Sequence, residues 1–214
     1  MVKKTREIAL ATRESLLVAA LQVFRERGVA HTRLSDVAER AGVTRGAIYW
    51  HFKDKAELFQ AVCERGTMPV EALLAEASQS VQRDPLATVR QLALMALTQL
   101  AQHADTQAMF DVIFHKCEFT EELAPVVAKN DADRVACLSQ VQRLFEQAVA
   151  CGQLPPVTDT FLATQGLHAY MVGLMHEWVL NPESYDLAAC AAPLLDCYLS
   201  GLATRPPVCR PTAG

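Results

Sequence analysis

Two short helices around a tight turn are predicted by the run RLSDVAERAGVTRGAIYWHFKDKAEL, which spans residues 33–58. In its first half, apolar residues recur at spacings of three and four, which places one apolar stripe on a short helix. The stripe consists of Leu34, Val37, Ala38 and Ala41. Thr32 is expected to cap the start of this helix, and Gly42 to end it in a left-handed conformation.

The second helix of this run combines a buried side with a polar and aromatic outer face. Its inward residues are Ile48 and Phe52, four positions apart. A small residue at 38, glycine at 42 and a branched residue at 48 form the steric pattern of a helix-turn-helix, expected over residues 33–52. The outer face then holds Thr44, Arg45, Gly46, Tyr49, Trp50 and His51. An ordinary polar hairpin is the alternative, but an exposed Tyr-Trp pair favours a double-stranded DNA partner.

This outer face suits the major groove of DNA. The Arg45 guanidinium can donate two hydrogen bonds to guanine O6 and N7. Thr44 caps the helix start, where its hydroxyl and the free backbone N–H groups can meet a phosphate or a base edge. Gly46 would let the helix approach the groove closely, although a glycine without a role is the alternative. Arg33 and Ser35, at the start of the first helix, are expected to reach the DNA backbone.

The run AGVTRGAIYWHFKDK, residues 41–55, resembles the signature of the tetracycline-repressor (TetR) family of bacterial transcription regulators. The likeness extends over about residues 8–65. The stretch FHKCEF, residues 114–119, and the helix spacing resemble the branch that represses multidrug efflux-pump operons. This resemblance implies a three-helix DNA-binding head, an all-helical ligand-binding and dimerisation body, and release of the operator when a small molecule binds.

The resemblance also implies roles for single residues. Tyr49, Trp50 and His51 are similar to the family's triplet of phosphate and base contacts. Lys55 is similar to its phosphate-contacting lysine, at a helix start where its charge adds to the helix dipole. Lys53 is expected to be a solvated neighbour. For Trp50, packing against the first helix as a core residue is the alternative.

The chain is expected to be all-α, with about nine helices. A helix-turn-helix DNA-binding domain over 8–65 is followed by a ligand-binding and dimerisation domain over 66–204 and a disordered tail over 205–214. Outside the motif, helices are expected near 8–27, 55–80, 85–104, 106–117, 126–151, 158–180 and 186–203. Asp54 and Glu57 form a capping box, Asp84 and Pro85 an N-cap and N1 pair, and Pro69 should bend or divide its helix.

Charge is divided unevenly along the chain. Residues 1–65 contain 12 Lys and Arg against 8 Asp and Glu, a net charge of +4. The remaining residues carry a net charge of −8, so the whole chain has a net charge of −4. A basic head suits a phosphate backbone, and an acidic body disfavours wrapping DNA around the rest.

The helices over 158–180 and 186–203 carry apolar residues around nearly their whole circumference. A helix that is apolar all round must be buried all round. We therefore expect a homodimer in which these two helices of each copy form an isologous four-helix interface. A fully central helix inside a monomer is the alternative.

A small-molecule pocket is expected inside the body, where apolar positions at helical spacing converge. The candidate lining residues are Leu92, Ala96, Phe110, Phe114, Cys137, Val141, His168, Met171, Val172 and Met175. Met and aromatic side chains adapt to large, flat, apolar molecules. The alternative is that these residues simply form the core, with His168 as a satisfied core histidine.

No cofactor or metal is expected, because the spacing of His115, Cys117 and Glu118 is not a metal-ligand pattern. Seven scattered cysteines without a Cys-x-x-Cys pair indicate reduced thiols in a cytoplasmic protein, with a thiol redox switch as the alternative. The basic start lacks a continuous apolar signal region, and no run reaches the roughly 18 uninterrupted apolar residues of a membrane span.

These observations together predict a ligand-responsive repressor that binds an inverted-repeat operator as a homodimer and leaves it when an apolar or aromatic inducer binds. A regulator, repressor or activator, that senses an endogenous metabolite or autoinducer is the alternative. A non-specific architectural DNA protein would need more basic charge. An enzyme is disfavoured because the sequence shows no Ser/His/Asp arrangement, glycine-rich phosphate loop or metal cluster.

Overall fold

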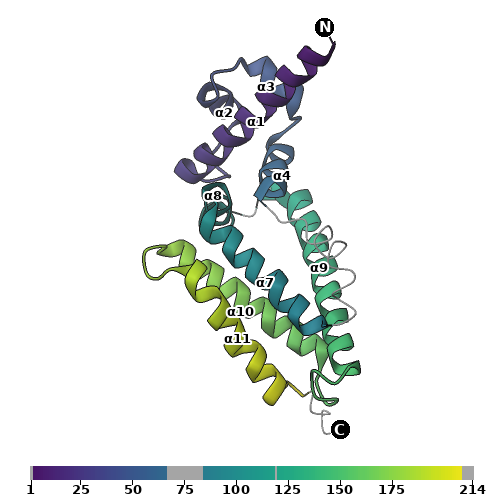
Figure 1. The fold of residues 1–214 in the computed structure, drawn as a ribbon. Coiled ribbons are helices and arrows are strands. Elements are labelled where there is room, and N and C mark those ends of the chain that lie inside the picture. The colour runs from purple at the N-terminus through teal and green to yellow at the C-terminus, as the bar shows by residue number, and fades with distance from the viewer. Residues whose placement is uncertain (1, 67–83, 119, 209–214) are drawn as a thin grey trace. The chain divides into compact units, whose positions relative to one another are not determined.

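The computed structural model describes residues 2–66, 84–118 and 120–208. Within these ranges it contains nine α-helices and no strand (Figure 1), which confirms the predicted all-α class. The α-helices are α1 (Val2–Arg27), α2 (Leu34–Arg40), α3 (Arg45–His51), α4 (Lys55–Gly66), α7 (Pro85–Gln102), α8 (Ala104–Asp111), α9 (Ala124–Ala150), α10 (Thr160–Leu180) and α11 (Leu187–Thr204). The predicted helical stretch beyond Gly66, with Pro69, and the tail residues 209–214 lie outside the described residues.

The chain forms two compact units. Unit 1 comprises Met1–Thr67 and Ala104–Asp131, and unit 2 comprises Met68–His103 and Ala132–Gly214. Compactness thus groups the segment 104–131 with the predicted DNA-binding domain, although this segment follows it in sequence by almost forty residues. We call helices α1 to α4 the head.

The core of unit 1 shows why the segment 104–131 belongs with the head. α1 packs against α2, α4 and α8, and the head core includes fully buried Phe24 and Ile48. Leu123 and Val126 are buried in the same core. Ion pairs such as that between Arg25 and Asp111, at 3.1 Å, lie partly exposed around it. Because exposed pairs contribute little, apolar burial is the main tie between the two segments.

The sequence predicts a single helix over residues 106–117, but the structure divides this stretch into two parts. α8 is followed by a π-helix, η1 (Val112–Lys116), and a 3-10 turn, η2 (Glu121–Leu123), precedes α9. The Lys116 carbonyl at the end of η1 accepts a hydrogen bond from the Val29 N–H at 3.0 Å. Gly28, beside it, has a φ of +81°, so a side chain here would be strained.

The turn of the helix-turn-helix is close to its prediction. Gly42 has a φ of +67°, and the Thr44 hydroxyl caps α3 by accepting a hydrogen bond from the Ala47 N–H at 3.2 Å. The predicted Thr32 cap is wrong, because Arg33 occupies the N-cap of α2. Thr32 is buried instead, and its hydroxyl donates to the Gly28 carbonyl at 2.7 Å.

The predicted capping box at the start of α4 is confirmed in part. The Asp54 carboxylate accepts a hydrogen bond from the Glu57 N–H at 2.8 Å, as expected of an N-cap. The Glu57 carboxylate accepts from the Lys53 N–H at 2.7 Å, one residue earlier than in the standard box. Two backbone donors at this helix start are therefore satisfied locally.

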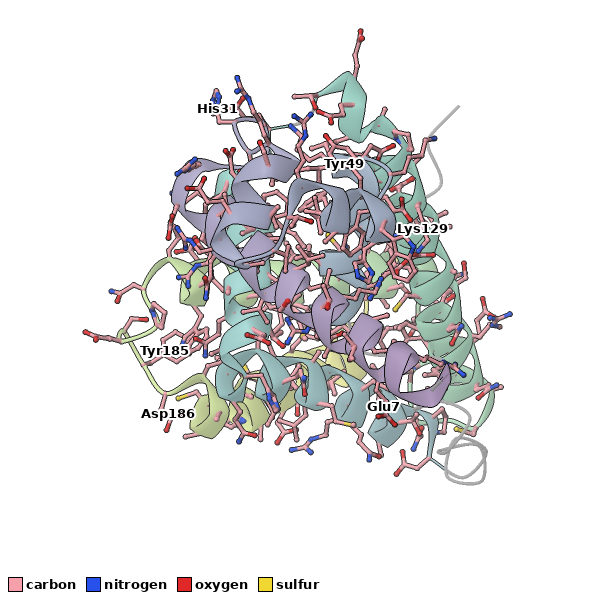
Figure 2. The ribbon with its side chains drawn as sticks, turned by 90° about the horizontal axis from the view of Figure 1, so that it is seen from above. Glu7, His31, Tyr49, Lys129, Tyr185 and Asp186 are labelled. Carbon is pink, nitrogen blue, oxygen red and sulfur yellow. The ribbon has the colours of Figure 1, made fainter. Side chains whose placement is uncertain are left out.

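Unit 2 is built on α7, α10 and α11. α7 packs along α11, and α10 contacts both; Figure 1 shows α10 and α11 side by side. Figure 2 shows Tyr185 and Asp186 in the loop that joins these two helices, where the Trp178 indole N–H donates to the Tyr185 carbonyl at 3.0 Å. Asp84 caps α7 and Pro85 opens it, as predicted.

Close packing between α10 and α11 depends on a glycine. The Tyr198 hydroxyl donates to the Ala163 carbonyl at 3.3 Å, and its ring stacks on Tyr170 with centroids 5.1 Å apart. A Cβ at Gly166 would lie only 2.6 Å from the Tyr198 hydroxyl oxygen. A side chain at 166 therefore cannot fit without moving the tyrosine.

Candidate nucleic-acid interface

The helix α3 is buried on one side and open to solvent on the other. Ile48 is fully buried, whereas Tyr49 is 48% exposed and Trp50 is 73% exposed. Thr44, Arg45 and Gly46 are exposed as well, and so are Arg33 and Ser35 at the start of α2. The alternative in which Trp50 packs into the core is therefore wrong.

The exposed side chains of α3 are partly ordered by one another. The Arg45 guanidinium lies 5.6 Å from the centroid of the Tyr49 ring, within cation–π range. The Trp50 ring meets the His51 ring edge-on, with centroids 4.6 Å apart. A Cβ at Gly46 would meet only the Thr44 hydroxyl, at 3.9 Å, so the chain itself has room for a side chain there. Internal packing therefore does not explain this glycine.

His51 is the predicted contact whose charge depends most on its surroundings. It is half-buried, and burial lowers the pKa of its imidazole, with a further contribution from the Arg13 guanidinium. Both effects disfavour the protonated ring. In the DNA-free protein, His51 therefore holds its proton less strongly than an ordinary histidine.

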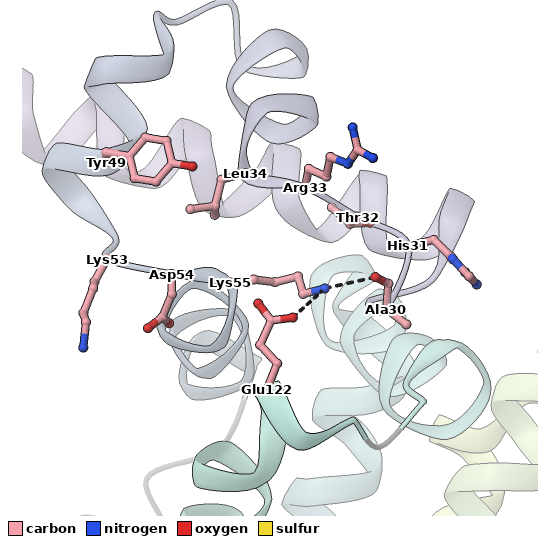
Figure 3. Close-up of a pocket in the computed structure, with 10 residues that line it drawn as sticks. All are labelled: Ala30, His31, Thr32, Arg33, Leu34, Tyr49, Lys53, Asp54, Lys55 and Glu122. Atoms are coloured by element: carbon pink, nitrogen blue, oxygen red, sulfur yellow. Dashed lines mark hydrogen bonds and ion pairs between the residues drawn. The ribbon is translucent and has the colours of Figure 1, made fainter.

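A polar groove of about 530 Å³ lies in unit 1 between the loop after α1 and the start of α4 (Figure 3). Its lining residues are Ala30, His31, Thr32, Arg33, Leu34, Tyr49, Lys53, Asp54, Lys55 and Glu122. Three of the predicted DNA contacts, Arg33, Tyr49 and Lys55, share this groove. His31 at its rim projects outward in Figure 2.

Lys55 is placed differently from the free phosphate contact that the family resemblance implies. Its side chain is only 11% exposed, and its ammonium pairs with the Glu122 carboxylate at 3.0 Å. The same ammonium donates to the Ala30 carbonyl at 3.0 Å (Figure 3). Sequence reasoning did not identify Glu122, because it is 67 positions away and nothing local marks it as a partner.

The predicted ligand-pocket residues fall in both units. Phe110 and Phe114, with ring centroids 5.4 Å apart, belong to unit 1, and the other eight belong to unit 2. Within unit 2, Leu92, Val141 and Met171 pack against one buried cluster. Val172 is 37% exposed.

The remaining members of the unit 2 set are Ala96, Cys137, His168 and Met175, all half-buried. Burial lowers the pKa of His168, and the Arg134 charge lowers it further. A neutral imidazole is therefore favoured at this position.

In the ranges 2–66, 84–118 and 120–208, no group of three or more His, Cys, Asp or Glu side chains could hold a metal ion. The six cysteines in these ranges are free thiols. Burial raises the pKa of Cys63 to about 12, which disfavours its reactive thiolate.

One described helix, α11, is long and apolar enough to cross a membrane by length and composition alone. Its mean hydropathy is 1.4 over 18 residues, and 28% of them are buried. Core helices of water-soluble proteins pass the same test, and α11 packs on α7 and α10.

Comparison with known proteins gives matches over both parts of the chain. Residues 16–62 match the family model described as bacterial regulatory proteins, tetR family. Residues 84–204 match the model of the C-terminal region of MAATS-type transcriptional repressors. The HTH-type transcriptional regulator TtgR of Pseudomonas putida is 39% identical over 207 residues, covering 96% of this chain and 98% of that protein.

Solved structures agree with these matches. NalD, described as the secondary repressor of the MexAB-OprM multidrug efflux pump in Pseudomonas aeruginosa, is 34% identical with a TM-score of 0.82. That similarity covers 91% of this chain and 97% of the NalD chain. A complex of SmeT with triclosan is 29% identical with a TM-score of 0.74, covering 94% of this chain and all of the other. The present chain belongs to the tetR family of bacterial transcription regulators.

Proposed function

We propose that this protein is a ligand-responsive repressor that binds an inverted-repeat operator as a homodimer and controls a multidrug efflux-pump operon. The observation that carries the proposal is the solvent-exposed outer face of α3, with Arg45, Tyr49 and Trp50 on a helix whose other side is buried. The efflux-pump target is supported by the similarity to NalD. Such a regulator acts in the cytoplasm and has no enzymatic activity of its own.

In the proposed complex, α3 enters the major groove. Arg45 reads a guanine, while Thr44 and the N-terminal N–H groups of α3 meet phosphate or a base edge. Gly46 adds no bulk between helix and groove, which gives this glycine a role that packing does not. Tyr49, Trp50 and His51 contact phosphates and neighbouring bases, and Arg33, Ser35 and Lys55 serve the backbone.

The proposed dimer uses the outer faces of α10 and α11. On α10, exposed apolar or small residues recur at helical spacing: Leu162, Ala169, Val172, Gly173 and Leu180. On α11 the exposed face consists of the small residues Ala189, Pro193, Cys197, Ser200 and Gly201, together with Asp196, which pairs with Arg90. Small residues allow helices to approach closely, and an apolar stripe without a partner favours association.

A dimer also supplies the specificity that one head lacks. Two heads related by a two-fold axis would read half-sites about 34–36 Å apart on one face of the duplex. An inverted repeat in the operator mirrors that symmetry.

The proposed inducer is a flat, apolar or aromatic molecule held by the body. Support comes from the half-buried apolar and sulfur-containing side chains of unit 2. The similar SmeT structure contains triclosan, a molecule of this kind. Phe110 and Phe114 are proposed as further contacts.

The test is selection of binding sites from a pool of random-sequence duplexes, followed by footprinting and sedimentation. We expect an enriched inverted repeat with half-site centres about 10 base pairs apart, bound by two copies of the chain. Enrichment of no sequence, or binding by a single copy to an asymmetric site, would contradict the proposal.

A further inference from the structure

Lys55 lines the polar groove of unit 1, but its ammonium is paired with Glu122 instead of being open to a ligand. Lys55 shares the groove with Arg33 and Tyr49, yet its ammonium is already engaged by a carboxylate and a carbonyl. We propose that Glu122 competes with DNA phosphate for Lys55, so that the η2 turn restrains DNA binding by the head. This inference rests on the proposed function.

The geometry around the ammonium favours competition. A lysine ammonium has three N–H donors, and two of them are used by Ala30 and Glu122. A phosphate that took the third would bring its charge to about 5 Å from the Glu122 carboxylate, because both would accept from one nitrogen at hydrogen-bond distance. Like charges at that separation repel, so phosphate binding favours departure of Glu122.

If phosphate is to replace Glu122 at Lys55, the glutamate must be free to leave while the lysine stays in place. The exposures of the two side chains fit this requirement. The Lys55 side chain is 11% exposed and is held at the Ala30 carbonyl, whereas the Glu122 side chain is 49% exposed. Glu122 can therefore turn into solvent while Lys55 stays in the groove. The residue after it, Leu123, is fully buried in the core of unit 1. This anchor keeps the carboxylate near Lys55 and raises its effective concentration as a competitor.

Glu122 lies in the short η2 turn directly before α9, so a movement of this turn would change its contact with Lys55. α9 begins at Ala124, two residues after Glu122, and the cap of η2 is Thr120. Any change that reorients η2 moves the carboxylate toward or away from Lys55. The affinity of the head for phosphate would change without any change in α3.

The experiment compares Glu122→Gln with Glu121→Gln, which removes the same charge from the neighbouring exposed residue of the same turn. Affinity is measured for the selected operator and for random duplex in about 0.1 M salt. Glu122→Gln is expected to tighten both by about 2- to 5-fold, the range for releasing a partly exposed ion pair. Glu121→Gln should change them less, because it has only the long-range charge effect.

A double-mutant cycle with Lys55→Ala decides whether the gain passes through Lys55. Lys55→Ala should weaken operator and random DNA alike and flatten the salt slope by about one. On that background, Glu122→Gln should have no more effect than Glu121→Gln. Circular dichroism melting confirms that each variant is folded.

Three outcomes would overturn the inference: no gain with Glu122→Gln, a gain that persists without Lys55, or an unchanged salt slope in Lys55→Ala. The proposed function would survive each of them, since the wild-type chain would still select an inverted repeat. If the wild-type chain binds no DNA, the proposed function itself fails and the competition falls with it.

Discussion

Packing within the chain explains the residue type at some positions and not at others. Gly166 is required by the Tyr198 hydroxyl, which would lie 2.6 Å from any Cβ. Arg45 is exposed and touches only the ring of Tyr49 among the contacts described for it. A residue that folding does not require is the better candidate for a role in recognition.

Replacing Arg45 with Ala should relax sequence preference. Loss of a bidentate contact to guanine is expected to cost about 1–3 kcal/mol on the operator and much less on random duplex. Fluorescence anisotropy with both duplexes measures the difference. Lys53→Ala is the matched control, because it removes one exposed charge and should weaken both duplexes alike. Equal losses on both duplexes for Arg45→Ala would refute base recognition.

His51 should make DNA binding depend on pH. Its pKa lies below the ordinary value in the free protein, and a nearby phosphate would raise it by stabilising the protonated ring. Binding would then take up a proton, so affinity should increase as pH falls through the pKa of the imidazole in the complex, and level off below its lower pKa in the free protein. Titrations between pH 8 and pH 5.5 should show this rise, and His51→Gln should remove it. A pH dependence that survives this substitution would assign the effect to another group.

Gly166→Ala should destabilise the protein by about 1–3 kcal/mol, the usual cost of overpacking. Urea denaturation measures the change. The informative control is the same substitution on a Tyr198→Phe background, where the clashing oxygen is gone and the next ring atom would lie 3.8 Å away. There the cost of alanine should largely disappear. If the cost is the same on both backgrounds, the clash is not its cause.

At the scale of helices, the main contrast is between the two sides of α10 and α11. The inner sides bury Leu167, Leu195 and Leu199. The outer sides expose mainly small and apolar residues, with the carboxylates Glu177 and Asp196 among them. A Cβ at Gly173 or Gly201 would meet nothing within 4 Å in the single chain. Both glycines are therefore free of internal packing, and a dimer interface explains them better.

Gly201→Arg should separate the proposed dimer without harming the protomer. Replacing a helical glycine improves helix propensity by up to about 1 kcal/mol, and a positive charge near the end of α11 suits the helix dipole. In a two-fold interface the same substitution would place two bulky charges together. Sedimentation equilibrium should show at least a 10-fold weaker self-association, whereas Val157→Arg, at an exposed loop residue, should leave it unchanged. An undisturbed dimer in Gly201→Arg would place the interface elsewhere.

At the scale of the whole molecule, the predicted DNA contacts all belong to unit 1, and the proposed dimer helices belong to unit 2. Most of the proposed ligand contacts also belong to unit 2. Regulation by a ligand therefore requires that the two binding events share a coupling free energy. Such coupling is reciprocal by thermodynamic necessity.

Triclosan, the ligand of the similar SmeT structure, is a suitable probe of that coupling. We expect it to weaken operator binding, and operator to weaken triclosan binding by the same factor, in the range of about 5- to 150-fold. Calorimetric titration of free and operator-bound protein measures both. Equal triclosan affinity in the two states would contradict ligand-driven release. Failure of triclosan to bind at all would favour an endogenous metabolite as the inducer.

Most of the secondary structure could be predicted from the sequence because helix caps and turn glycines act on neighbouring residues. Asp84, Gly42 and Thr44 act on backbone groups within a few residues, so their roles are visible in the sequence. The Thr32 cap was wrong although the actual partner is also local: this hydroxyl is buried and donates to the Gly28 carbonyl, four residues earlier. A rule based on residue type cannot tell whether the Thr32 hydroxyl bonds to a backbone N–H of α2 or to the Gly28 carbonyl once the side chain is packed.

The all-helical class, the helix-turn-helix and the outward side chains of its second helix could be inferred from sequence alone. Periodicity and caps act within one or two turns of chain, so no distant contact was needed to infer them. Three features emerged from the folded chain alone: the segment 104–131 shares the core of the head, Lys55 is held by Glu122, and Gly166 makes room for Tyr198. The residues that meet are 86 positions apart for Arg25 and Asp111, 67 for Lys55 and Glu122, and 32 for Gly166 and Tyr198, so chain folding rather than local preference determines which atoms meet.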